Sequence, residues 1–253
     1  MKAELKSLSS EMAQIVGAHL MMVPLLIDDD PELAYRHAEA ARCRAARLPI
    51  TREATAEAAY AAGMFEEALT QFKTLRRMTG SPDVIPAMVD CLRALGKYRE
   101  ALELADSGSR EIEDPSMAIE LLIVTAGVRV DMGQREEGMR LLRREIERPT
   151  MRHPQLAQAR LLFAYGDLLS QAGDTAGAYH CFSIAASLDP SETTAAFSRL
   201  DEMDGVTFEL DESEFVDEDT DIDDSDDDEL PEDFEEIEDS EEIEDSEEDG
   251  EEA

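Results

Sequence analysis

The sequence predicts an all-α protein in which about five helical hairpins stack into a solenoid. Apolar residues recur at helical spacing through most of the first 200 positions. Glycines at 63, 96, 133 and 173 interrupt these patterns, and each is followed by a second helical pattern. Together with a turn near Asp29, these hinges are 34, 33, 37 and 40 residues apart. A helix pair that recurs at such a period indicates a repeat protein.

The clearest copy of the repeat runs from Ala59 to Phe72. Gly63 allows the left-handed backbone conformation that ends the first helix, and the small Ala68 lets the second helix approach closely. Phe72 lies one turn further along the same face. Similar arrangements surround Gly96 and Gly173.

The copy around Gly133 is weaker. Arg135 stands at the aromatic position and Gly138 at the alanine position.

The elements follow in order from these signals. Asp30-Pro31 and Asp114-Pro115 each read as an N-cap followed by proline in the first helical turn. The first helix is expected to break near Pro24, because proline removes a backbone hydrogen bond. The expected helices cover 12–27, 31–48, 51–62, 65–79, 83–95, 98–107, 117–132, 136–147, 154–172, 176–188 and a capping segment at 191–203.

The order glycine, aromatic, alanine, phenylalanine and proline at a period near 34 resembles the tetratricopeptide repeat (TPR) over nearly all of residues 10 to 200. Whether the first hairpin is a true repeat stays open. The resemblance implies a right-handed α-α superhelix whose concave side is lined by the first helix of each hairpin. With its long acidic C-terminus, the chain is similar to a group of TPR proteins from high-GC Gram-positive bacteria (actinobacteria), which supplies no catalytic residue.

Charge divides the chain at about residue 204. Residues 201–253 hold 32 of the 61 acidic residues and none of the 23 Lys and Arg, and they include the duplicated hexamer Glu-Glu-Ile-Glu-Asp-Ser at 235–240 and 241–246. High charge of one sign with few large apolar residues is typical of disorder. We therefore expect a helical solenoid with a capping helix over 1–204 and a disordered acidic low-complexity tail over 205–253.

The family register places a mixed set of side chains on the concave groove. The resemblance implies that Glu53, Glu57, Tyr60, Asp90, Arg93, Ile123, Phe163 and Asp167 face it, with Val130, Asp131 and Arg160. Acidic residues stand where chaperone-binding relatives carry the Lys and Asn that clamp a terminal carboxylate. The groove therefore suits a basic or apolar segment, although charged helix faces are often only solvated surface.

The second helices carry most of the basic residues. A candidate basic face comprises Arg76, Arg77, Arg140, Arg143, Arg144 and Arg148. Arginine fits phosphate well, so nucleic-acid binding is a specific hypothesis. Interspersed glutamates, the absence of tryptophan and a competing acidic tail argue against it. We therefore do not expect nucleic acid as a direct ligand.

No motif for catalysis, cofactor binding or metal binding is recognisable, so we expect no enzyme activity, no cofactor and no metal site. Cys43, Cys91 and Cys181 lack zinc-ligand spacing, and we expect each to be a small buried residue. The apolar stretch near the N-terminus is interrupted and too short to span a bilayer, so no membrane attachment is expected and a cytoplasmic location is favoured.

The favoured function is a non-enzymatic scaffold or adaptor that binds a protein or peptide on its TPR surface. The acidic tail would provide solubility, autoinhibition or recruitment of basic partners. The alternative is a nucleic-acid-associated regulator whose tail competes with nucleic acid for the arginine-rich face. The sequence identifies neither the partner nor the oligomeric state.

Overall fold

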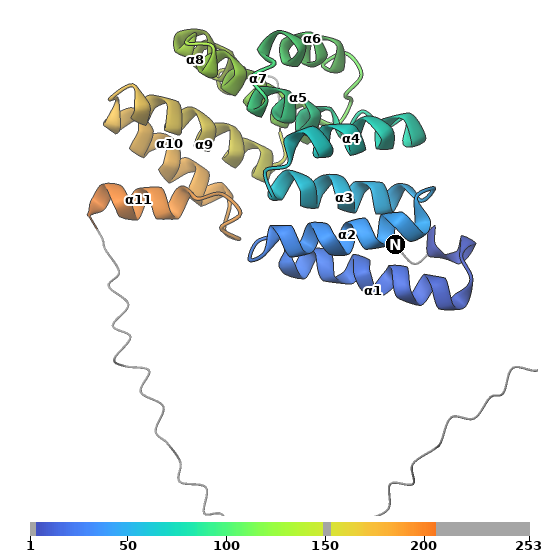
Figure 1. Ribbon diagram of the computed structural model, residues 1–253. Coiled ribbons are helices and arrows are strands. Elements are labelled where there is room, and N and C mark those ends of the chain that lie inside the picture. Colours follow the sequence, from blue (N-terminus) through green and yellow to red (C-terminus); the bar gives the residue numbers. More distant parts are fainter. Residues whose placement is uncertain (1–3, 149–152, 206–253) are drawn as a thin grey trace, which may run out of the picture. The chain divides into compact units, whose positions relative to one another are not determined.

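A computed structural model describes residues 4–148 and 153–205, and in these residues all regular structure is helical. The predicted acidic tail, apart from Gly205, lies outside the described residues. By their contacts, the described residues belong to one compact unit. The helices in chain order are η1 (Glu4–Ser7), α1 (Ser10–Leu26), α2 (Pro31–Ala45), α3 (Pro49–Ala61), α4 (Phe65–Thr79), α5 (Ile85–Ala94), α6 (Tyr98–Gly108), α7 (Pro115–Asp131), α8 (Arg135–Ile146), α9 (Gln155–Gln171), α10 (Thr175–Leu188) and α11 (Ala196–Asp204) (Figure 1).

Consecutive helices pack as five antiparallel hairpins, from α1 with α2 to α9 with α10, and α11 covers the last one (Figure 1). Several first helices also contact one another across hairpins: α1 contacts α3, α5 contacts α7, and α7 contacts α9. Within the described residues, α4, α6 and α8 make no comparable contact with one another. The first helices therefore lie closer together than the second helices. We call the surface of α1, α3, α5, α7 and α9 the inner face.

The predicted glycine hinges are confirmed at all four positions. Gly63, Gly96, Gly133 and Gly173 have φ values of 71°, 70°, 79° and 87°, in the left-handed region. At the first hinge the Met64 amide donates to the Ala59 carbonyl at 2.8 Å, and an equivalent bond closes the other three. This is the Schellman arrangement that ends a helix. The α1–α2 turn differs, because no residue of it has a positive φ; there the Asp30 side chain caps α2 by accepting from the Leu33 amide at 2.9 Å.

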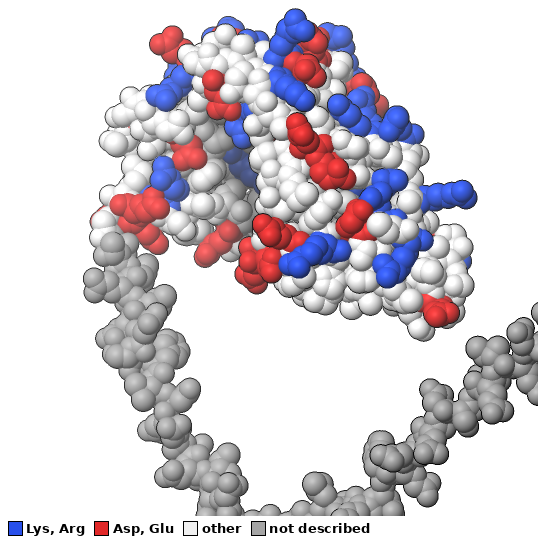
Figure 2. Space-filling model, viewed as in Figure 1, with Lys and Arg blue, Asp and Glu red and all other residues white. Residues whose placement is uncertain are grey.

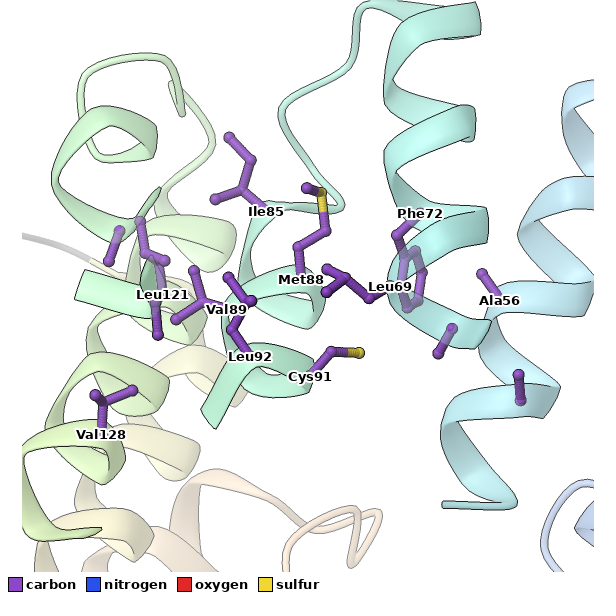
Figure 3. Close-up of a cluster of buried hydrophobic side chains, with 14 residues drawn as sticks. Ala56, Leu69, Phe72, Ile85, Met88, Val89, Cys91, Leu92, Leu121 and Val128 are labelled. Carbon is purple, nitrogen blue, oxygen red and sulfur yellow. The ribbon is translucent and has the colours of Figure 1, made fainter. Parts of the chain in front are cut away.

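Two large clusters of buried side chains form most of the core. The first joins α3, α4, α5, α6 and α7 around Phe72, Met88 and Leu121 (Figure 3). The second surrounds the fully buried Phe182 and joins α7, α8, α9 and α10. Because α7 contributes to both clusters, the hairpins from α3 to α10 share one apolar interior.

The packing of α8 against α7 requires glycine at position 138. A Cβ atom built at Gly138 would lie 2.9 Å from the Ala126 carbonyl oxygen and 3.1 Å from Val130 Cγ2. The α8 backbone approaches α7 too closely even for a methyl group. The repeat that looked weakest in sequence therefore has a closer helix contact than alanine would allow.

Three expectations about local structure are corrected. Pro24 does not break α1, because the helix continues through it and ends two residues later at Leu26. Cys43 is exposed, because the alanines of α2 form the buried stripe and Cys43 lies away from it. The capping helix begins at Ala196 instead of near 191, and a short 3-10 helix precedes α1.

No helix in the described ranges combines the length and apolar character needed to cross a bilayer.

The close approach at Gly138 generates the first prediction. Replacing Gly138 with alanine improves helix propensity but forces α8 away from α7, and we expect a net loss of about 1–2 kcal/mol in the free energy of unfolding. Gly17→Ala is the matched control, because its new Cβ would meet only the tip of Leu5 at 3.4 Å. The control should be neutral or up to about 1 kcal/mol more stable. Chemical denaturation measures both. A Gly138→Ala variant as stable as Gly17→Ala contradicts the close approach.

A second prediction concerns the turn that follows α10. The buried Asp189 accepts from the Thr194 amide at 2.5 Å and from the Ser191 hydroxyl at 3.0 Å. The Thr194 amide is the main reason that the pKa of this carboxyl is lowered to about 2. A carboxyl whose folded pKa lies below its unfolded value stabilises the protein above the unfolded pKa, near about 4, and this contribution is lost as the pH falls towards 2. Asp189→Asn should therefore lower the melting temperature at pH 7, and the difference from wild type should shrink below about pH 4. A difference that does not change with pH contradicts this role.

Candidate functional site

Four polar side chains form a continuous row across the inner face. The Tyr60 hydroxyl, from α3, donates to Asp90 Oδ2 on α5. Asp90 Oδ1 accepts from Arg93 Nε at 2.8 Å, and Arg93 Nη1 lies 3.8 Å from Asp131 Oδ2 on α7. These residues, called the polar row below, link the first helices of three successive hairpins.

The surroundings of Tyr60 keep its phenol protonated. Burial, together with the hydrogen bond to Asp90 and the charge of Asp90, raises the pKa of Tyr60, so the phenol keeps its proton and remains a donor. Burial likewise raises the pKa of the neighbouring Cys91 to about 12. The thiol is fully buried, so Cys91 is not poised to act as a nucleophile.

Gly127 leaves room for the Arg93 guanidinium. A Cβ atom at Gly127 would lie 2.7 Å from Arg93 Nη1. The arginine therefore crosses from α5 and lies directly against the α7 backbone. Sequence reasoning missed Gly127, since a glycine inside a helical pattern signals a close approach without naming its partner.

An apolar recess lies between α1 and α3 at the other end of the inner face. It encloses about 340 Å³ and is lined by Leu20, Val23, Pro24, Ile27, Ile50, Glu53, Ala54 and Glu57. The residues Glu53 and Glu57 are its only charged lining groups. Desolvation by the surrounding protein, with a contribution from Glu53, raises the pKa of Glu57. No basic side chain of the described residues forms an ion pair with either carboxylate.

The remaining predicted groove residues serve packing and helix pairing. Ile123 and Phe163 are half-buried against the second core cluster. Asp167 pairs with Arg199 of α11 at 3.2 Å, and Arg160 of α9 pairs with Glu120 of α7 at 2.6 Å. The predicted groove set is therefore not one uniform strip. The structure joins Tyr60, Asp90 and Arg93 in the row and places Glu53 and Glu57 at the recess.

The candidate basic face is divided between α4, which carries Arg76 and Arg77, and α8, which carries Arg140, Arg143 and Arg144 and is followed by Arg148. Most of these arginines have local partners. Arg76 pairs with Glu111 at 2.7 Å, Arg140 with Glu137 at 2.7 Å and Arg148 with Glu145 at 3.4 Å, and Arg143 donates to the Tyr165 hydroxyl at 2.7 Å. Figure 2 shows acidic and basic side chains interspersed on the face in view. A continuous cationic strip of the kind that follows a phosphate backbone is not formed by these six residues.

A groove between α4 and α6, above α5, was not expected from the sequence. It encloses about 870 Å³, with Lys73, Arg76 and Arg77 on one wall and Glu100 and Glu103 on the other. Its two walls belong to different hairpins, so no local sequence signal could have indicated it. Among the described residues, no group of three or more His, Cys, Asp and Glu side chains is placed to hold a metal ion.

Comparison with known proteins shows the fold. No protein-family model matches the sequence, and no curated protein matches it. The structure is similar to a thermophilic TPR protein, TTC0263 of Thermus thermophilus, with a TM-score of 0.58 and 15% identity over 76% of this chain and 97% of that one.

Two further TPR structures are more distant. MamA of Desulfovibrio magneticus has a TM-score of 0.46 and 14% identity, covering 71% of this chain and 97% of its own. YrrB, described as a TPR protein with an unusual peptide-binding site, has a TM-score of 0.41 and 15% identity, covering 72% of this chain and 90% of its own. The likeness to TTC0263, together with the five hairpins and their glycine hinges, shows that the described chain has the fold of a tetratricopeptide repeat solenoid.

Proposed function

We propose that the protein is a non-enzymatic scaffold that binds a segment of another protein along its inner face. The polar row carries this proposal. Its members are held by one another, yet the side chains of Arg93 and Asp131 remain 34% and 39% exposed. A guanidinium has five N–H donors, and Arg93 directs only part of them to Asp90 and Asp131. The row therefore offers fixed donors and acceptors to the backbone amides of a bound segment without a large ordering cost.

The shape and charge of the inner face favour an extended, basic segment. The row and the recess together span α1, α3, α5 and α7. A surface that crosses four helices is longer than a small-molecule site needs. Glu53, Glu57, Asp90 and Asp131 outnumber the single arginine of the row. A phosphate backbone would meet like charge here. On α4 and α8, where the alternative nucleic-acid hypothesis would place a ligand, the pairing of arginines with glutamates disfavours phosphate binding.

The acidic tail fits the same proposal. Its charge has the same sign as the inner face, so we propose that it attracts basic partners over long range and keeps the protein soluble. Autoinhibition through the inner face is disfavoured, because a tail without Lys or Arg would add like charge to Glu53, Glu57, Asp90 and Asp131.

The test starts from the full-length protein and a random library of linear peptides. Peptides selected on the wild type are measured by fluorescence anisotropy against Tyr60→Phe and Asp131→Asn. Each variant removes one polar function of the row with little change in shape. We expect affinity to fall about threefold to tenfold in each, because a hydrogen bond is worth about 1 kcal/mol.

Arg77→Gln on α4 is the control, and its affinity should not change. Unchanged melting temperatures show that the variants remain folded. Selected peptides that bind both inner-face variants as tightly as the wild type, or that lose affinity only with Arg77→Gln, contradict inner-face binding.

A further inference from the structure

The recess between α1 and α3 has the features of an anchor site. We propose that it takes one aliphatic side chain of the bound protein segment and that Glu53 and Glu57 bind an arginine or lysine directly beside that side chain. This inference rests on the proposed inner-face function and names the partner chemistry that the face selects.

The apolar part of the site comes from two hairpins. Leu20, Val23 and Ile27 of the first hairpin face Ile50 and Ala54 of α3 across the recess. The volume of about 340 Å³ accommodates a leucine, isoleucine or methionine side chain. Transfer of such a side chain from water into an apolar site is favourable by about 1.5–3 kcal/mol when burial is complete. The recess therefore favours an aliphatic group over a polar one.

The charged part of the site calls for a cation. Glu53 and Glu57 lie one turn apart on the same face of α3, so their carboxylates repel each other. Desolvation, together with the charge of Glu53, raises the pKa of Glu57, in agreement with this repulsion. A guanidinium or ammonium between the two carboxylates removes this repulsion. The acidic tail of this chain cannot supply it, because residues 201–253 contain no Lys or Arg.

The recess also connects to the polar row. Glu53, Glu57 and Tyr60 follow one another along a single face of α3, at helical spacing. Tyr60 donates to Asp90, which begins the row on α5. A segment anchored in the recess therefore places its basic residue beside Glu53 and Glu57, and its next residues reach the donors and acceptors of the polar row. In the ligand sequence, the aliphatic residue and the basic residue are therefore adjacent. The remaining contacts are between the polar row and the backbone of the ligand.

Three short fluorescein-labelled peptides test the anchor on the full-length protein. All have Gly and Ser flanks, and their centres are Leu-Arg-Arg, Ser-Arg-Arg and Leu-Gln-Gln. Fluorescence anisotropy at low salt should rank Leu-Arg-Arg above both of the others, because only it satisfies both halves of the site. Equal binding of Leu-Gln-Gln would assign the recess to a purely apolar partner, and equal binding of Ser-Arg-Arg would reduce it to non-specific charge attraction. Either result overturns the proposal.

The matched variants are Glu53→Gln with Glu57→Gln, and the control pair Glu100→Gln with Glu103→Gln on α6. Both pairs remove two negative charges from exposed helix positions. We expect the first pair to weaken Leu-Arg-Arg binding about fivefold or more and the control pair to leave it within about twofold. Equal effects of the two pairs overturn the anchor. Sedimentation of the free protein as a dimer that the peptide dissociates would assign the recess to a second copy and would also overturn it.

The two proposals can fail separately. If peptides from the random library respond to Tyr60→Phe but Leu-Arg-Arg does not bind, the inner face binds proteins without this anchor. If Leu-Arg-Arg binds with the expected dependence on Glu53 and Glu57 while the library peptides ignore the row, the recess is a local site and the extended inner-face function is wrong.

Discussion

The structure depends on one steric constraint, the near-contact of two helix backbones five residues after each hinge. The residues at this offset are Ala68, Ala101, Gly138 and Ala178, and all are buried. A larger side chain would separate the two helices of a hairpin and tilt every later hairpin with them. The left-handed glycine sets the direction of the chain, and the small residue sets the distance. Together they fix which side of each first helix faces inward.

The same constraint makes inner-face positions comparable from one hairpin to the next. Six residues before the hinges stand Glu57, Asp90, Gly127 and Asp167. Three are acidic, and the fourth has no side chain. The space at Gly127 is taken by the Arg93 guanidinium from the preceding hairpin. The polar row therefore forms where a glycine, Gly127, replaces the acidic residue of the other repeats and leaves space for Arg93 of the preceding hairpin.

Hinges and helix pairs could be predicted because each rests on short offsets in one hairpin. Gly138 could be recognised as unusual, but the sequence could not show that the Ala126 carbonyl occupies the place of its methyl group. The pairing of Arg93 with Asp131 and the α1–α3 recess both depend on the step between hairpins, which is the sum of many weak packing terms. Pro24 and Cys43 were misjudged for a similar reason, since the position within the helix and the position around it override residue type.

The inner-face carboxylates of α3 have no ion-pair partner among the described residues. Of the acids six residues before the hinges, Asp90 is held by Tyr60 and Arg93, and Asp167 by Arg199 of α11. For the corresponding Glu57, no described basic side chain forms an ion pair. At Asp90 and Asp167 an incoming cation would have to displace an existing partner. The attraction gained there would be largely offset by the desolvation cost of the cation. At Glu57 the cation instead relieves repulsion that is already present. Affinity for a basic segment is therefore expected to be set at the end of the face where the fold has left its carboxylates without partners.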